Sequence, residues 1–468
     1  MDDFLREIQT SLFREWINNQ KRDYYHLHQS ETDPDAIIIE NEYCYSYVTF
    51  NPQCIIELCV MNKRTDEMAF YLHFQFKTLK HAISLFEEMD QCIKKMIDQP
   101  ICRLLLCCSG GMTTAFFADK IKNGIKVLNL NMEVAATSYQ KIYNVAQNYD
   151  VILLAPQVSY VKLQVEKVFK NKLVLKIPTQ IFASYNVGAL ITFVEESLKH
   201  KENKYNGYVE PLASMMEIKT NKNVLAVSIN ANGENSHISY RLYNSHQDIV
   251  LDSNIIKSNI KLHDVLDALD TVVLQNEMID VISIALPGVM VEGNVYSGII
   301  EGGNHQLKER LEKRYEKEIY LINDVNAAVV GYYASQNEYK SLAFLFQPIG
   351  RMAGSGIVVN GQLVRGMDHL AGEVALLPLK LSDSYLNLAN TPEGTLELVT
   401  KNIMSIIAIV SPEAIVVYSD LILDSQDVSD EIKKALSQYP LKVYPKIIKV
   451  ENILEYILLG TMILSAKE

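Results

Sequence analysis

The stretch that most constrains this chain runs from Leu104 to Thr114 and reads LLLCCSGGMTT. Its apolar start predicts a buried strand, and the Ser-Gly-Gly segment predicts a sharp turn before a helix that begins at Met112. Alternation of strands with helices continues over the next hundred residues, and this pattern is typical of a parallel sheet with helices on both faces. The stretch therefore predicts an α/β fold with Cys108 in a loop at a helix N-terminus.

That position gives Cys108 a chemical role. Backbone N–H groups point outward at a helix N-terminus, and the positive end of the helix dipole favours both a phosphate-sized anion and a thiolate. Cys108 is therefore a candidate nucleophile, and the residues expected to hold the anion are Ser109, Gly110, Gly111, Met112, Thr113 and Thr114. The alternative is that Cys108 is a small buried apolar group, as we expect for Cys107 at the strand end.

Cysteine phosphatase loops carry an arginine six residues after the nucleophile, and here that position is Thr114. Without a guanidinium the loop can hold a phosphocysteine but lacks the usual means of hydrolysing it. Over residues 101–199 the chain resembles the IIB component of the lactose/cellobiose class of the bacterial sugar phosphotransferase system (PTS). The resemblance implies that Cys108 receives a phosphoryl group from a IIA histidine and passes it to sugar in a IIC membrane channel.

Composition restricts the partners and the cellular compartment that we expect for the protein. With 468 residues the chain suggests about three domains, and its net charge of -12 argues against a nucleic-acid or anionic membrane surface. All seven cysteines lie within the first 108 residues without a CxxC pair, so neither a disulfide scaffold nor a zinc knuckle is expected. No apolar run reaches the ~18 residues of a membrane span. We expect a cytoplasmic protein without a cofactor.

The predicted domains are 1–98, 99–200 and 221–468, joined by a linker at 201–220. The first is a small α+β domain of unknown role, whose first helix is expected to bury a stripe that includes Phe4, Leu5, Ile8, Leu12, Phe13 and Trp16. Its expected strands are Ala36–Glu40, Tyr43–Phe50, Cys54–Asn62 and Glu67–Phe76, followed by a helix over Thr78–Ile97. The four parallel strands of the second domain are expected at Cys102–Cys107, Lys126–Asn131, Asp150–Leu154 and Leu173–Ile177.

The last domain resembles the ROK family of sugar kinases and repressors, which have an actin-like fold of two lobes that close on sugar and ATP. The resemblance rests on Leu321–Gly331 (LINDVNAAVVG), Ala285–Gly288 (ALPG), Gly354–Gly361 (GSGIVVNG) and Ala371–Glu373 (AGE). It implies that Asp324 is catalytic and that Gly288, Asn323, Asp324 and Glu373 bind the sugar. A carboxylate such as Asp324 can act as base toward a sugar hydroxyl, but it can equally cap the helix that follows.

The chain departs from the ROK pattern where ATP would bind. Ser228–Asn232 (SINAN) stands in place of the first phosphate loop, and the magnesium-binding aspartate is absent. Gly350–Gly354 (GRMAG) replaces the second phosphate loop, and Tyr418-Ser419 replaces a nucleotide-side Gly-Gly pair. The zinc ligands of the family are missing as well. These changes predict a pseudokinase that binds sugar without ATP.

Three classes of function follow. The first is a PTS-linked sensor or regulator of carbohydrate use, with a IIA protein as phosphoryl donor and a sugar or sugar phosphate as ligand. The second is an enzyme, either a IIB phosphocarrier that serves a separate IIC channel or an atypical ROK sugar kinase. The third is a DNA-binding repressor, which we disfavour because residues 1–98 hold 17 acidic and 10 basic residues and predict no helix-turn-helix. The expected assembly is a homodimer.

Overall fold

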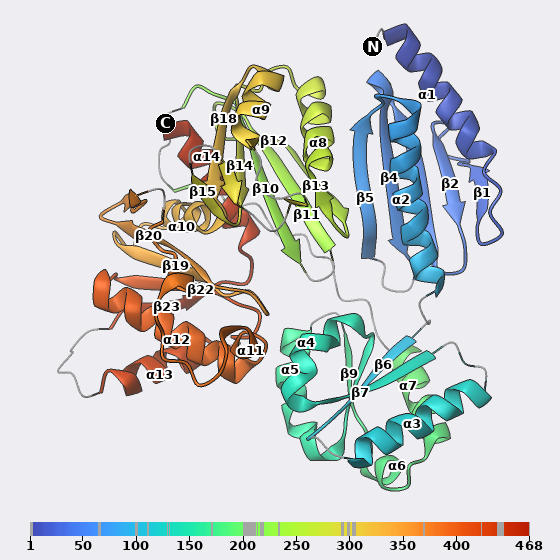
Figure 1. The fold of residues 1–468 in the computed structure, drawn as a ribbon, viewed down its shortest axis with the longest axis vertical. Helices are drawn as coiled ribbons and strands as arrows, with labels where there is room; N and C mark the ends of the chain where they lie inside the picture. The colour runs from blue at the N-terminus through green and yellow to red at the C-terminus, as the bar shows by residue number, and fades with distance from the viewer. Residues whose placement is uncertain are drawn as a thin grey trace.

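The structure is a computed structural model of the 468-residue chain (Figure 1). It describes residues 3–63, 67–98, 102–109, 112–128, 130, 132–169, 172–199, 212, 214–215, 220–232, 235–291, 294–296, 300–301, 306–367, 370–422, 424–437 and 444–467. Within this part of the chain no helix is both long and apolar enough to cross a membrane. The fold is α/β, with the parallel four-stranded sheet and the two lobes that the sequence predicts.

The N-terminal unit, residues 3–98, is an antiparallel sheet covered by two helices. Its elements are α1 (Asp3–Asn18), β1 (His26–Gln29), β2 (Ala36–Glu40), β3 (Cys44–Asn51), β4 (Ile55–Asn62), β5 (Glu67–Gln75) and α2 (Leu79–Asp98). The four predicted strands and the second helix are confirmed to within two residues, whereas β1 was not expected. The prediction for the first helix is wrong in part, because Phe4 and Leu12 are exposed and its fully buried residues are Phe13 and Ile17.

The IIB-like unit, residues 102–199, has four parallel strands in the order β7-β6-β8-β9. The strands are β6 (Cys102–Cys108), β7 (Met132–Ser138), β8 (Val151–Leu154) and β9 (Leu173–Lys176), and the helices are α3 (Met112–Val127), α4 (Ile142–Val145), α5 (Lys162–Val168), α6 (Thr179–Ala183) and α7 (Val187–Lys199). Three of the strands were placed correctly. The second was expected over Lys126–Asn131, two positions of which lie outside the described residues, but α3 continues to Val127 and the strand begins at Met132.

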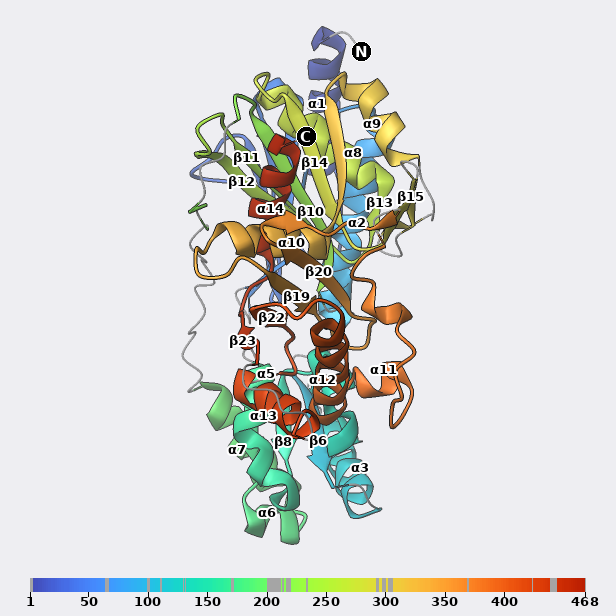
Figure 2. The same cartoon turned by 90° about the vertical axis from the view of Figure 1, so that its left-hand side faces the viewer.

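The ROK-like unit has two lobes. Lobe 1 contains β10 (Val224–Asn232), β11 (Asn235–Tyr243), β12 (Ile249–Lys257), β14 (Val281–Leu286) and β18 (Glu318–Asn323), with α8 (Leu262–Gln275) and α9 (Leu307–Tyr315). Lobe 2 contains β19 (Leu342–Phe346), β20 (Gly354–Val359), β21 (Gln362–Leu363), β22 (Ala414–Tyr418) and β23 (Lys446–Lys449), with α11 (Tyr385–Leu388), α12 (Pro392–Ile409) and α13 (Ser425–Ala435). Helices α10 (Asp324–Ala334) and α14 (Leu454–Lys467) pack together between the two sheets (Figure 2).

Two glycines allow α10 and α14 to approach closely. A Cβ atom on Gly460 would lie 1.8 Å from the carbonyl oxygen of Ala327, and one on Gly331 would lie 2.0 Å from the carbonyl oxygen of Tyr456. Such distances are impossible, so the crossing requires glycine on both helices. Because α10 begins at Asp324, this crossing also positions a predicted site residue.

The N-terminal unit and lobe 1 share one ten-stranded sheet, in the order β1-β2-β3-β4-β5-β12-β11-β10-β14-β18. Strand β5 joins β12 in antiparallel fashion, with Tyr71 opposite Ile256. Buried side chains of both units form a single apolar core, and His73 pairs with the Tyr240 hydroxyl across the junction at 2.8 Å. The N-terminal unit, which we expected to be a separate domain, therefore extends the sheet of lobe 1.

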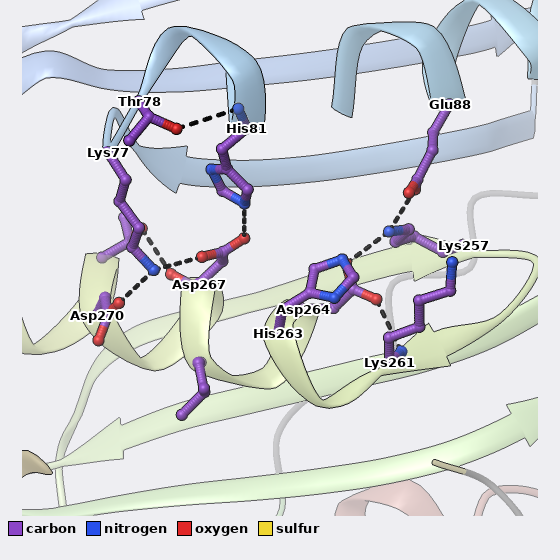
Figure 3. A network of polar contacts seen from close by, with 12 residues as sticks. Lys77, Thr78, His81, Glu88, Lys257, Lys261, His263, Asp264, Asp267 and Asp270 are labelled. Atoms are coloured by element: carbon purple, nitrogen blue, oxygen red, sulfur yellow. Dashed lines mark hydrogen bonds and ion pairs between the residues drawn. The ribbon is translucent and has the colours of Figure 1, made fainter. Parts of the chain in front are cut away.

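Buried ion pairs reinforce this junction (Figure 3). Lys77 lies 2.5 Å from both Asp267 and Asp270, and His81 lies 3.0 Å from Asp267. Burial alone would raise the pKa of Asp267, but His81 and Lys77 hold it below its ordinary value. The N-terminal unit therefore supplies the groups that keep Asp267 of α8 ionised.

Candidate functional site

Cys108 lies at the carboxyl end of β6, where Ser138 of β7 is its register partner. It is therefore the last strand residue, whereas we expected Cys107 there and Cys108 in the loop. The Cys108 side chain belongs to the apolar core of the IIB-like unit, with only 6% of its surface exposed, and its Sγ lies 4.0 Å from the carbonyl oxygen of Thr137. Other protein atoms therefore cover most of the Cys108 side chain.

The predicted anion loop is described in part. Ser109 is exposed and α3 begins at Met112 as expected, but Gly110 and Gly111 lie outside the described residues. For Met112, Thr113 and Thr114 the structure describes the helical backbone only. The anion-binding role of these six residues remains a prediction.

Cys107 has the packing role that was expected for it. It is fully buried, and burial, followed by the neighbouring Cys108, raises the pKa of Cys107 to about 12. A thiol in this state supplies almost no thiolate near neutral pH. Cys107 is therefore the natural control for experiments on Cys108.

In lobe 1 the predicted sugar-binding residues meet where β18 ends and α10 begins. Asn323 is the N-cap of α10, since its Oδ1 accepts hydrogen bonds from the backbone N–H groups of Val325 (3.1 Å) and Asn326 (3.0 Å). Its Nδ2 donates to the carbonyl of Gly288 (3.3 Å), a glycine with φ of 125°. The alternative that Asp324 caps the helix is therefore wrong, because Asn323 does so and Asp324 is the first helical residue.

Asp324 is buried, and its environment suits a general base. Burial raises the pKa of Asp324 from 3.8 to about 6, and the negative charge of Glu373 adds to the rise. Burial also raises the pKa of Glu373 itself. The structure thus brings the charge of Glu373 within reach of Asp324, although the two residues are 49 positions apart in the sequence. Both carboxyl groups hold their protons more tightly than ordinary ones, as acid–base groups in binding and catalytic sites often do.

We predict that Asp324→Asn stabilises the protein at neutral pH. The folded state binds the Asp324 proton more tightly than the unfolded chain does, so wild type loses stability as the pH rises from about 4 to 6 and does not regain it above that. Asparagine stays neutral, and the variant should be more stable than wild type by about 2–3 kcal/mol at pH 7.5 and equal to it near pH 4.

Thermal unfolding at a series of pH values checks this prediction. Asp119→Asn, a change on the exposed face of α3, serves as the control and should leave the pH profile unaltered. A variant Asp324→Asn that is less stable than wild type at pH 7.5 would contradict the burial argument.

On the nucleotide side of lobe 2, protein groups occupy the loop that would bind phosphate. The N–H of Gly350 donates to the carbonyl of Ala389 (2.9 Å), and the N–H of Ala353 donates to the Tyr385 hydroxyl (3.1 Å). Gln347 donates from Nε2 to the carbonyls of Pro348 and Arg351, both at 2.9 Å. Sequence reasoning missed Gln347 and Tyr385, because neither lies within a recognised motif.

The other nucleotide-side positions are filled as well. Tyr418 packs against Phe346 with ring centroids 5.4 Å apart, where the family has glycine, and Ser419 beside it is buried. In lobe 1, Ser228–Asn232 continues the ladder with β11 and offers no carboxylate for magnesium. These residues lack the carboxylate that a magnesium–nucleotide complex requires, and the loss of ATP binding stays a prediction. Within the described ranges no cluster of three or more His, Cys, Asp or Glu side chains could hold a metal ion.

Comparison with known families accounts for both regions. The family model described as PTS system, lactose/cellobiose specific IIB subunit, matches residues 103–192. The ROK family model matches residues 232–395. One chain thus carries a lactose/cellobiose-type IIB domain and a ROK domain. No curated protein matches the chain.

Solved structures of ROK proteins are similar to about half of this chain. A ROK family protein from Streptococcus pneumoniae in complex with sucrose is 19% identical over 51% of this chain and 97% of its own, with a TM-score of 0.41. A ROK family glucokinase from Streptomyces griseus in complex with glucose and AMPPNP is 14% identical over 51% and 98%, with a TM-score of 0.41. A ROK family transcriptional regulator, homologous to the Escherichia coli MLC protein, is 15% identical over 53% and 79%, with a TM-score of 0.40.

Proposed function

We propose that this protein is a PTS-linked sensor or regulator of carbohydrate use, in which Cys108 carries phosphate and the ROK domain binds a sugar or sugar phosphate without ATP. The single observation that carries the proposal is the pairing, in one chain, of a IIB domain with a ROK domain whose nucleotide-side loop is occupied by its own side chains. Such a chain joins two measures of the same nutrient, its uptake flux and its concentration.

The chemical step is a phosphoryl exchange. The Cys108 thiol first gives its proton to solvent, and the thiolate attacks the phosphorus of a IIA phosphohistidine. The S–P bond forms as the N–P bond breaks, and the histidine leaves as neutral imidazole because its other ring nitrogen carries a proton taken from solvent. The phosphorylated cysteine carries about -1.5 to -2 more charge than the thiol at the end of β6.

The ROK domain supplies the ligand site of the proposal. Asp324 and Glu373 lie close enough for their charges to interact, and the Asn323 amide is committed to the helix cap and to Gly288. We therefore assign the sugar hydroxyls chiefly to the two carboxylates, with Asn323 and Gly288 shaping the wall. Without a nucleotide the site binds its ligand and does not phosphorylate it.

A second candidate is that the chain is an ordinary IIB phosphocarrier for sugar uptake, with a IIC channel as its acceptor. The match of residues 103–192 to the IIB subunit favours it, because that match needs no ROK domain. The two functions differ in one respect. Only the regulator requires that sugar binding and Cys108 phosphorylation influence each other.

The test is phosphorylation of the full chain with phosphoenolpyruvate, the general PTS proteins and a lactose/cellobiose-type IIA, followed by intact mass measurement. Wild type and Cys107→Ser should gain one phosphoryl group, and Cys108→Ser should gain none. A gain that survives in Cys108→Ser would place the phosphoryl group on another residue.

Isothermal titration then tests the ROK site. Sugars or sugar phosphates should bind to wild type and bind at least tenfold more weakly to Glu373→Gln. Tight binding of ATP that requires magnesium would overturn the pseudokinase part of the proposal. The homodimer expected above remains a prediction.

A further inference from the structure

The carboxyl ends of strands from two sheets face each other where the IIB domain meets lobe 2. Tyr139 directly follows Ser138, the register partner of Cys108, and its hydroxyl donates to Oε1 of Glu393 in the first turn of α12 at 3.3 Å. Leu421 of lobe 2 is 2% exposed and belongs to the apolar core of the IIB domain, and Ile349 packs against the same core. Figures 1 and 2 both show the IIB domain beside lobe 2.

These contacts come from corresponding parts of the two sheets. Cys108 and Tyr139 lie at the carboxyl ends of β6 and β7, while Ile349 and Leu421 follow the carboxyl ends of the parallel strands β19 and β22. Ligand sites of parallel sheets lie at the carboxyl ends of the strands. The carboxyl ends of β6 and β7, where Cys108 lies, therefore face the carboxyl ends of β19 and β22, where a ROK kinase would bind its nucleotide.

Lobe 2 presents a cation at this junction. Arg351 is exposed, and its guanidinium has no ion-pair partner in the part of the chain that the structure describes. The backbone of Arg351 is held in place, because its carbonyl accepts a hydrogen bond from Nε2 of Gln347. Arg351 is also only two positions from Ile349, which packs against the core of the IIB domain. Arg351 also stands where the ROK pattern has threonine, so this cation is a feature of this chain.

An unused donor lies at the same edge. The Ser419 hydroxyl is buried and has no hydrogen-bond partner among the described residues, and Ser419 precedes Leu421 by two positions. A buried hydroxyl without a partner costs free energy unless a ligand satisfies it. Ser419 and Arg351 both follow the carboxyl ends of lobe 2 strands, and hydroxyl and guanidinium groups are donors that bind phosphate.

We propose that lobe 2 reads the phosphorylation state of Cys108, and that Arg351 is the side chain that binds the phosphocysteine. The IIB loop itself has Thr114 where a phosphatase has its arginine, and lobe 2 supplies the guanidinium from the other domain. Phosphorylation then adds a charge-assisted contact to the junction and orders the Gln347–Ala353 loop. This inference rests on the proposed function, since it names the residue through which Cys108 would act on the ROK domain.

The first test needs no phosphoryl donor. Iodoacetate is an anion and iodoacetamide is neutral, and both alkylate Cys108 at rates that peptide mapping of the full chain can measure. The ratio of the iodoacetate rate to the iodoacetamide rate reports the local charge, because the accessibility of the sulfur affects both rates equally. Arg351→Gln should lower that ratio by roughly threefold or more. Arg351→Lys should preserve it, and Arg310→Gln, an exposed arginine on α9 of lobe 1, should leave it unchanged. Equal ratios in wild type and Arg351→Gln overturn the placement of Arg351.

The second test uses the phosphorylated chain. Phosphorylation should slow amide hydrogen exchange across residues 347–353 in wild type and in Arg310→Gln, but not in Arg351→Gln. Normal phosphorylation with identical exchange in all three proteins overturns the inference and leaves the proposed function standing. Failure of Cys108 to accept phosphate, with an alkylation ratio that still responds to Arg351, would instead remove the proposed function and keep the charge assignment.

Discussion

Replacing Gly460 by alanine is expected to unfold the ROK domain or to lower its free energy of unfolding by at least about 3 kcal/mol. The new methyl group would lie 1.8 Å from the carbonyl oxygen of Ala327, and the obstacle is backbone that cannot rotate away. Alanine favours an isolated helix by about 1 kcal/mol over glycine, so the predicted loss is a packing effect that outweighs helix propensity.

The control for this prediction is the same change at Gly188 in α7, where the nearest atom to a new methyl group is Oδ1 of Asn186 at 3.8 Å. Thermal unfolding and limited proteolysis of both variants should show loss of structure for Gly460→Ala alone. If Gly460→Ala unfolds like wild type, the packing of α10 against α14 differs from that described. Because α10 begins at Asp324, a partly folded Gly460→Ala protein should also lose sugar binding.

Lys257→Met is the second change with a large expected effect, a loss of about 3–5 kcal/mol. Lys257 is buried and lies 2.5 Å from both Glu88 of the N-terminal unit and Asp264 of α8 (Figure 3). Burial alone would lower the pKa of Lys257, but these two carboxylates raise it above its ordinary value. Methionine fills the space and leaves Asp264 in the interior without its cation.

Chemical denaturation measures the loss, and Lys222→Met supplies the matched control. Lys222 pairs with Glu318 at 2.7 Å on the surface, where removal of the cation should cost less than 1 kcal/mol. The triple change Lys257→Met, Glu88→Gln, Asp264→Asn should recover part of the stability, since it removes the unpaired charges. Equal effects of Lys257→Met and Lys222→Met would contradict the role assigned to the junction.

Local pattern predicted much of the fold. Alternating apolar residues located β2 to β5 to within two residues, and the glycine turn after Cys108 located β6 and α3. The strand expected at Lys126–Asn131 was wrong because Phe117, Ile121 and Ile125 continue the helical spacing of α3 through the apolar segment that resembled a strand. The exposed stripe of α1 escaped prediction because periodicity shows that a face is apolar but not that anything covers it.

Long-range contacts could not be predicted. Lys77 and Asp267 are 190 positions apart, and nothing in the sequence around either residue indicates that they form an ion pair. The same holds for Tyr139 and Glu393, which are 254 positions apart. At the candidate sugar site, Asn323 and Asp324 are both good helix caps, so the choice between them needed the backbone geometry. The distinction matters, because it leaves Asp324 as the titratable group.

The ten-stranded sheet has a mechanical consequence. Lobe 1 cannot rotate toward lobe 2 without carrying residues 3–98 with it, because the hydrogen-bonded ladder and the buried charges tie them into one rigid body. Any rotation of lobe 1 relative to lobe 2 would therefore also move α1, which exposes Phe4, Leu5, Ile8 and Leu12 to solvent. On the function proposed above, closure of the two lobes on a sugar would therefore also change the position of the exposed apolar face of α1.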